Sequence, residues 1–132
     1  MKRLAWMIPI VAVLACMAGL AACTDEETFD EPADRARLAK METEIDDLIG
    51  EPTCKDGKEC RVMAFGAKPC GGPWSFKVFS VSSVDSTALA DLVDDYNIYN
   101  RTLNDRYGWS SDCTVVMPPN VDCVEGRCVV VE

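Results

Sequence analysis

The chain has 132 residues, of which 22 are acidic and 13 basic, so its net charge at neutral pH is −9. This balance argues against nucleic acid as a partner, because phosphates are bound by lysine and arginine, and it favours a neutral or basic protein, a peptide or a glycan. Histidine is absent, which removes the commonest general base and the commonest metal ligand. We therefore predict no catalytic residue, no metal site and no cofactor.

The N-terminus has the pattern of an export signal. Lys2 and Arg3 precede an uncharged stretch that ends in Leu20-Ala21-Ala22-Cys23. This pattern resembles the lipobox of bacterial lipoproteins, which implies cleavage after residue 22, acylation of Cys23 and attachment to a membrane through the lipid. The alternative is an uncleaved transmembrane helix, but the stretch is shorter than the ~20 apolar residues of a usual span. Thr24 after the cysteine implies the outer membrane, with the protein facing the periplasm or the cell surface.

Composition divides the chain into four segments: a signal peptide at 1–22, the lipidated cysteine with an acidic tether at 23–34, an amphipathic helix at 35–50, and a disulfide-rich module at 51–132. The helical pattern itself extends over 32–49, and its apolar residues are spaced three, four and three apart: Leu38, Met41, Ile45 and Leu48. This stripe can pack on the chain's own module or associate with a second copy. We favour the first, because two heptads are marginal on their own.

Six cysteines remain outside the signal and the lipid site: Cys54, Cys60, Cys70, Cys113, Cys123 and Cys128. An even number in a small exported domain predicts three disulfides. Their spacings do not match the close cysteine pairs of zinc sites. The best long-range pair by position is Cys70 with Cys113.

The module is predicted to contain short strands and one long helix. Strands are expected over 60–65, 74–81 and 113–117, with a turn-rich loop at 66–73. The helix is expected over 86–107, with Asp85 as its N-cap and Gly108 after its last turn. Its outer, solvated face is predicted to carry Asp91, Asp94, Asp95, Asn97, Asn100, Arg101 and Asp105.

A β-hairpin is expected over 122–131, with Glu125 and Gly126 as its turn. This register places Cys123 opposite Cys128, at a separation that a disulfide can span. A Cys123–Cys128 bridge is therefore allowed, although each cysteine can instead reach a neighbouring strand.

These elements predict an α+β fold: a small disulfide-stabilised module with a short antiparallel sheet packed against one long helix. The motifs Cys70-Gly71-Gly72-Pro73-Trp74 and Cys123-Val124-Glu125-Gly126-Arg127-Cys128 resemble those of small exported bacterial lipoproteins of unknown function. The resemblance covers roughly residues 54–128. It implies this architecture and supplies no catalytic residue.

The loop at 66–74 is the candidate binding surface. It offers backbone groups at Gly71 and Gly72, a cation at Lys68, and an aromatic ring at Trp74. We expect Trp74 to be part of the core, as aromatic residues at strand starts usually are. Trp109 either is exposed for binding or packs back on Tyr107, and both remain open.

Two functions of different class follow. The first is a lipid-anchored envelope protein that acts as a binding or inhibitor module through its disulfide-pinned loops, without catalysis. The alternative is a structural envelope lipoprotein that forms oligomers through the helix at 32–49. An enzyme that uses carboxylates or a free thiol is the least favoured.

Overall fold

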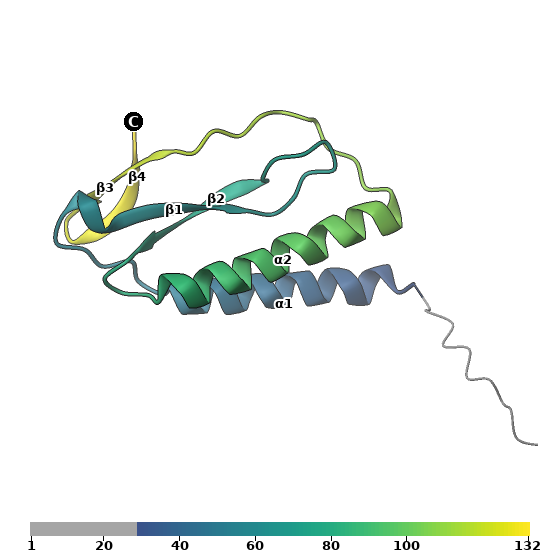
Figure 1. Ribbon diagram of the computed structural model, residues 1–132, viewed down its shortest axis with the longest axis horizontal. Helices are drawn as coiled ribbons and strands as arrows, with labels where there is room; N and C mark the ends of the chain where they lie inside the picture. Colours follow the sequence, from purple (N-terminus) through teal and green to yellow (C-terminus); the bar gives the residue numbers. More distant parts are fainter. Residues whose placement is uncertain (1–28) are drawn as a thin grey trace, which may run out of the picture.

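The structure is a computed structural model that describes residues 29–132, so the predicted signal peptide, Cys23 and residues 24–28 lie outside the described part. Two helices and two small antiparallel sheets make up an α+β fold. The predicted class is therefore right. The helices predicted at 32–49 and 86–107 are both present, but the strands form two separate sheets in place of the single sheet that was predicted. Figure 1 shows the helices side by side and antiparallel, with the strands on one side of the pair. Within residues 29–132, no helix is both long and apolar enough to cross a membrane.

The first helix, α1, spans Glu31–Ile49 and confirms the helical pattern. The Asp30 side chain accepts a hydrogen bond from the N–H of Ala33, which caps the helix, and Pro32 fits its first turn. The predicted acidic tether therefore ends earlier than residue 34. Glu31 and Asp34 belong to the first turn of α1.

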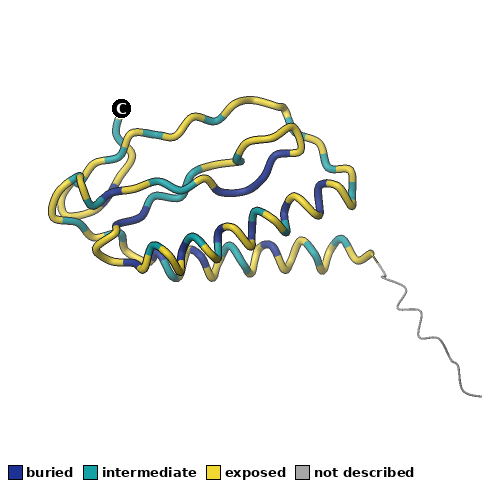
Figure 2. The backbone as a smooth tube through the Cα atoms, in the orientation of Figure 1, coloured by how far each residue is buried: buried dark blue, intermediate teal, exposed yellow. Residues whose placement is uncertain are grey.

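The apolar stripe of α1 packs on the second helix, α2, which spans Ser86–Tyr107. Leu38, Ile45 and Ile49 are buried in one core cluster with Leu89, Val93 and Leu103 of α2, and Met41 and Leu48 pack against that cluster. Figure 2 shows the buried residues along the space enclosed by the helices and strands. Packing of the stripe on the chain's own module is therefore confirmed, with Leu38 and Ile45 buried and Met41 and Leu48 partly buried.

Each sheet is a single hairpin. Strand β1, Cys60–Phe65, pairs with β2, Ser75–Ser80, after a short 3-10 helix at Gly57–Glu59. Strand β3, Asn120–Val124, pairs with β4, Arg127–Val131, and Cys123 lies opposite Cys128 as predicted.

The predicted strand at 113–117 is wrong. This segment is irregular and crosses above the strands in Figure 1, and the side chains of Val115 and Met117 are exposed. No neighbouring edge pairs with it among the described residues, and Pro118 and Pro119, which lack N–H groups, follow it directly.

Three disulfides join the module, as predicted. Cys70–Cys113 is confirmed, whereas Cys123 and Cys128 are not bonded to each other: the other pairs are Cys54–Cys123 and Cys60–Cys128. Cys123 and Cys128 lie opposite each other in the second hairpin, so their side chains share one face of the sheet. Each of the two is bonded to a cysteine elsewhere in the chain, Cys123 to Cys54 and Cys128 to Cys60. The bridges close loops of 43 to 69 residues, so each stabilises the fold by about 4 kcal/mol in the chain-entropy description.

Asp34 fastens the first half of α1 to α2. Its carboxylate accepts hydrogen bonds from the hydroxyl groups of Tyr99 at 2.5 Å and Tyr107 at 2.7 Å, and from the Arg106 guanidinium at 3.2 Å. The two tyrosine hydroxyls, followed by Arg106, lower the pKa of Asp34 below its ordinary value. The charged form of this side chain is therefore the one that the folded state stabilises.

We expect Asp34→Asn to lower the free energy of unfolding at neutral pH. The pKa of Asp34 is lower in the folded than in the unfolded chain, so its contribution is complete above the unfolded value and is lost as the pH falls through the folded value. Urea unfolding at a series of pH values should show the difference between wild type and variant shrinking on acidification. Asp105→Asn is the control, because this exposed carboxylate has no hydrogen bond or ion pair among the described residues. An equal, pH-independent loss in both variants would contradict the role of Asp34.

Candidate functional site

An open cleft lies where α1, α2 and the start of β2 meet. Its larger part, about 470 Å³, is lined by four aromatic residues, two aliphatic ones and four polar ones: Phe65, Trp74, Tyr96, Trp109, Leu38, Ala39, Arg35, Glu42, Ser75 and Asn100. A second hollow of about 440 Å³ shares Arg35, Trp74 and Trp109 with it. We call this continuous feature the tryptophan cleft. An aromatic lining with a few polar groups is the usual composition of ligand sites in proteins.

Trp74 is not a core residue, contrary to the sequence prediction. Its side chain is 42% exposed, although its backbone N–H donates to the Phe65 carbonyl oxygen at 3.0 Å and so extends the first hairpin. The ring packs over Gly66, and the Lys68 ammonium lies 5.2 Å from the ring centre. Trp74 is thus held at its base and open toward the cleft.

Of the two alternatives left open for Trp109, the structure shows the one in which its ring packs back on the end of α2. Its ring stacks on Tyr107 with centres 5.8 Å apart, and the Arg35 guanidinium lies 4.0 Å from the ring centre. The indole Nε1–H donates to Glu31 at 2.9 Å. This bond and those from Arg35 lower the pKa of Glu31. Trp109 is therefore half-buried at the side of the cleft, and its indole N–H already has a hydrogen-bond partner.

Two donors without partners lie in the cleft. Tyr96 and Asn100 are one turn apart on α2 and are only 8% and 5% exposed. The Asn100 Oδ1 accepts from the N–H of Ala67 at 2.8 Å, which sets the orientation of the amide and leaves its Nδ2 group unused. Within residues 29–132, neither this Nδ2 nor the Tyr96 hydroxyl has a hydrogen-bond partner.

The electrostatics keep this part of the cleft neutral. Burial, with a contribution from Glu42, raises the pKa of Tyr96 to about 12, so its hydroxyl remains a donor at physiological pH. The charged lining residues are paired: Arg35 bonds Glu31, and Glu42 accepts from Lys77 at 2.9 Å. An uncharged ligand with hydrogen-bond acceptors therefore fits these groups best.

Three asparagines of α2 hold the loop beneath Trp74. The Asn97 Oδ1 accepts from the N–H of Gly66 at 2.6 Å, and the Asn104 Nδ2 donates to the Ala67 carbonyl oxygen at 2.7 Å, on either side of the Asn100 bond. The prediction that Asn100 lies on the solvated face is therefore wrong, because the loop backbone offers it a partner. The signal in the sequence was the spacing of three and four between the asparagines, which places them on one helix face.

Lys68 is not an accessible cation. The residue is 7% exposed, and its Nζ donates to Asp112 at 3.0 Å and to the Thr114 carbonyl oxygen at 2.7 Å. The bond from Lys68, followed by those from Thr114, lowers the pKa of Asp112 to about 2. Lys68 thus clamps two loops together beside the Cys70–Cys113 disulfide.

Gly71 and Gly72 lie outside the tryptophan cleft. They form an exposed turn closed by a hydrogen bond from the Lys68 N–H to the Gly72 carbonyl oxygen, and they line a smaller hollow with the segment 113–116. Of the five predicted binding residues, the structure therefore places Trp74 and Trp109 in the tryptophan cleft and groups Lys68, Gly71 and Gly72 in a separate, smaller hollow. The other eight residues that line the larger part of the cleft, among them Tyr96, Asn100, Arg35 and Glu42, were missed by sequence reasoning.

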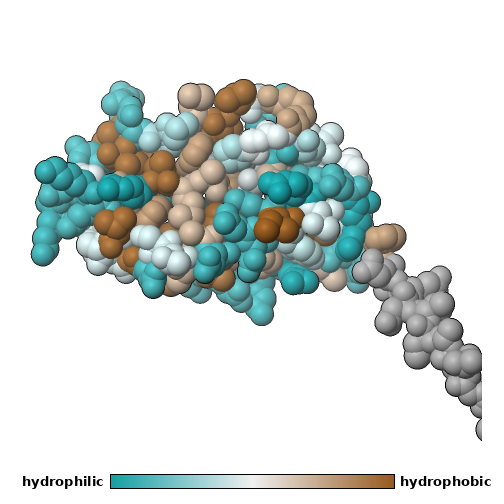
Figure 3. All heavy atoms as spheres, in the orientation of Figure 1, coloured by the Kyte–Doolittle hydropathy of each residue, from teal (hydrophilic) through white to brown (hydrophobic). Residues whose placement is uncertain are grey.

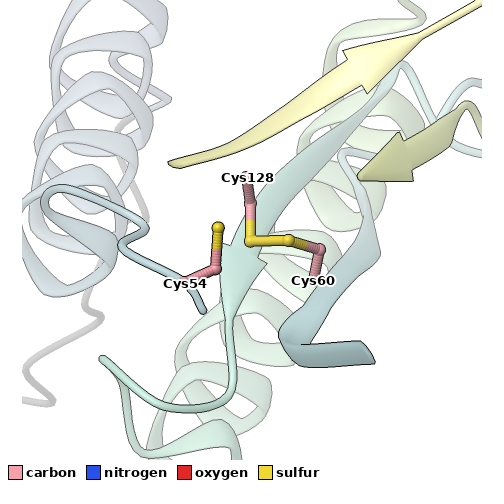
Figure 4. Close-up of side chains that lie close together, drawn as sticks. All are labelled: Cys54, Cys60 and Cys128. Atoms are coloured by element: carbon pink, nitrogen blue, oxygen red, sulfur yellow. A yellow bond between two sulfur atoms is a disulfide. The ribbon is translucent and has the colours of Figure 1, made fainter. Parts of the chain in front are cut away.

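Two other features of the molecule are weaker candidates. The sulfur atoms of Cys54, Cys60 and Cys128 lie within 4.8 Å of one another, and Figure 4 shows Cys54 beside the Cys60–Cys128 bond. All three belong to disulfides, and a metal needs thiolates. Apolar surface also gathers at the end that carries β3 and β4 in Figure 3, where Val124, Val129 and Val130 are exposed, but no polar group there specifies a ligand.

The contact between Gly66 and Trp74 can be tested with a matched pair of variants. Gly66 and Gly72 have φ values of +79° and +81°, so alanine meets the same backbone penalty, about 1–2 kcal/mol, at both. A Cβ atom on Gly66 would lie 2.7 Å from Cδ1 of Trp74, whereas Gly72 has nothing within 4 Å. We expect Gly66→Ala to cost about 1–3 kcal/mol more than Gly72→Ala in urea unfolding and to shift the Trp74 indole signal in NMR spectra. Equal costs and an unmoved indole would show that the ring does not rest on Gly66.

Comparisons with known proteins returned no relative: no family model, no curated protein and no solved structure matches this chain. The function must therefore be inferred from the cleft itself.

Proposed function

We propose that this chain is a lipid-anchored protein of the bacterial cell envelope that binds a ligand in the tryptophan cleft and catalyses no reaction. One observation carries the proposal: Tyr96 and Asn100 are largely buried residues that line the cleft, and the Tyr96 hydroxyl and the Asn100 Nδ2 group have no partner among the described residues and lie in the same lining as two tryptophans. These two donors are available to a ligand in the open cleft, where its hydrogen-bonding groups can replace those of solvent.

The rigidity of the cleft supports binding. The loop under Trp74 is held by side chains of α2 and by the Cys70–Cys113 disulfide, and Trp109 is held by Glu31 and Arg35. Walls that are ordered before the ligand arrives lose little conformational entropy on binding. A preformed site is therefore consistent with useful affinity from a modest contact area.

The chemistry of the remaining residues supports a role without catalysis. The sequence has no histidine, and all six cysteines of residues 29–132 are in disulfides, which leaves no free thiol in that part. The structural alternative, association through the helix at 32–49, has less support because Leu38 and Ile45 of the apolar stripe are buried in the chain's own core. Binding is the function that the site supports best.

Binding in the cleft predicts a localised spectral response. We expect a panel of neutral oligosaccharides and capped peptides, added to the purified full-length protein, to include a ligand that shifts the NMR signals of the Trp74 and Trp109 indoles and the Asn100 amide. Trp74→Ala should weaken that ligand more than tenfold, since central tryptophans commonly dominate binding. The control, Val130→Ala, removes another exposed apolar side chain, on β4, and should leave the affinity unchanged. A panel without a ligand, or one whose ligands leave these signals unmoved, would overturn the proposal.

The lipid anchor is tested by mass and fractionation. We expect wild-type protein to sediment with membranes and to carry a lipid-sized mass increment on Cys23, and Cys23→Ser to lose both. Cys16→Ser is the matched control, because a cysteine inside the signal peptide is removed on cleavage. An unmodified mass in the wild type would contradict the anchor and leave the cleft as it is.

A further inference from the structure

The three disulfides differ in how far solvent can reach them. Cys70 and Cys113 are both exposed, whereas Cys60 and Cys128 are each only 4% exposed. The third bridge is half-buried, and one of its sulfur atoms lies against the buried pair. A thiolate exchanges with a disulfide only where it can reach a sulfur atom. The Cys70–Cys113 bond is therefore the one that an external thiol meets first.

This bond holds a segment that has few other attachments. Residues 110–119 make no backbone hydrogen bond to a backbone group elsewhere in residues 29–132. Their polar contacts with the rest of that part are the bonds from Lys68 to Asp112 and to the Thr114 carbonyl oxygen, and the bond from the Ser111 hydroxyl to the Cys70 sulfur. Opening the bridge therefore leaves the segment attached mainly through one lysine.

The backbone at Cys113 also favours release. Its φ is +55°, in the left-handed region that residues other than glycine rarely adopt. The bridge keeps Cys113 in this conformation, and a reduced Cys113 is free to relax. The Lys68 bonds to the residues on either side of Cys113 keep the two sulfur atoms near each other, so the bond can form again.

The same bridge joins the two loops that contain the tryptophans of the cleft. Cys70 lies four residues before Trp74, and Cys113 lies four residues after Trp109. The hollow that extends the cleft is lined by Trp74 on one side and by Trp109 and Ser110 on the other. The redox state of this bond is thereby linked to the position of both sides of the cleft.

The rest of the fold does not depend on this bond. The helices and the first hairpin share a core cluster to which neither Cys70 nor Cys113 belongs. The other two disulfides attach both strands of the second hairpin to the chain before it. Loss of the exposed bridge should therefore change the loops and leave the helices and sheets in place.

We propose that Cys70–Cys113 is a redox switch, which a protein dithiol of the cell envelope reduces, and that reduction loosens the segment at 110–119 and shifts the tryptophans of the cleft. The inference rests on the proposed function for the source of the dithiol and for the role of the cleft. The reduction itself depends on neither.

The exchange takes place in two steps. A thiolate of the dithiol attacks Cys113 Sγ, the bond between Cys113 and Cys70 breaks, and Cys70 leaves with the electron pair and takes up a proton. The Ser111 hydroxyl, 3.4 Å from Cys70 Sγ, stabilises the departing thiolate. The second thiol of the reductant then attacks the mixed disulfide, Cys113 is released as a thiol, and the reductant leaves as a disulfide.

Selective reduction is tested with dithiothreitol, a small dithiol. The purified full-length protein is treated with rising concentrations under native conditions, alkylated and mapped by peptide mass. We expect Cys70 and Cys113 to be alkylated together and roughly tenfold faster, or more, than the four other cysteines of residues 29–132. Simultaneous reduction of all three bonds, or earlier reduction of another, overturns the inference.

A pair of double variants tests the consequence. Cys70→Ser with Cys113→Ser represents the reduced state and should shift the NMR signals of residues 110–119 and of the Trp74 and Trp109 indoles, with the helix and strand signals unchanged. The control, Cys54→Ser with Cys123→Ser, removes a bridge at the second hairpin and should shift signals of β3 and β4 instead.

The outcomes distinguish this inference from the proposed function. Indole signals that stay in place in both the reduced protein and the first double variant overturn the switch, and so does global unfolding on selective reduction. In either case, ligand binding by the oxidised cleft is unaffected. If no ligand is found for the oxidised cleft, the proposed function fails, while selective reduction with shifted indoles still supports the switch.

Discussion

The hydrogen bonds between the asparagines of α2 and the backbone of Gly66 and Ala67 are the interaction on which the rest of the molecule depends. Without them, the buried N–H groups of Gly66 and Ala67 would lack partners, and each such group costs about 1–3 kcal/mol. The bonds fix where the loop leaves β1 and returns to β2, and so they fix Trp74. The same loop carries Lys68 and Cys70, which bind the segment at 112–114. A single helix face thereby positions two loops that are distant in sequence.

The cleft follows from a second constraint, the docking of α1. Asp34 and Glu31 are charged residues, yet they form the contact that closes the first half of α1 on α2 and on Trp109. Each accepts from neutral donors as well as from an arginine, so the contact keeps part of its strength when salt screens the ion pairs. Arg35 and Glu42, which line the cleft, lie on this same helix. Two of the acidic residues that were predicted to belong to a tether, Glu31 and Asp34, therefore hold α1 in the position that forms the cleft.

Short sequence patterns correctly predicted the elements whose ends are determined by residues close in the chain. Helix α2 begins after its Asp85 cap and ends at Gly108 as predicted, and the turn at Glu125 and Gly126 defines the register of the second hairpin. Features that depend on distant partners could not be predicted in this way. Which face of the hairpin meets Cys54 and Cys60, and whether a paired edge exists for 113–117, depends on how the sheets and loops pack. Lys68 is buried because its acceptors come from 44 and 46 residues away, and Asn100 is buried because a loop needs it. From residue type alone, both Lys68 and Asn100 were predicted to lie on the surface.

The position at which α1 begins also limits where the protein can act. If Cys23 carries the lipid, only eight peptide units separate the anchor from Glu31. A fully extended chain covers at most about 3.6 Å per residue, so the helix begins within roughly 30 Å of the bilayer surface. Glu31 and Arg35 lie at that end of the helix and contact Trp109, so with such an anchor the cleft would stay close to the lipid headgroups. A partner anchored far away in the envelope would have to extend a flexible segment to it, whereas a neighbour in the same leaflet would meet it by lateral diffusion.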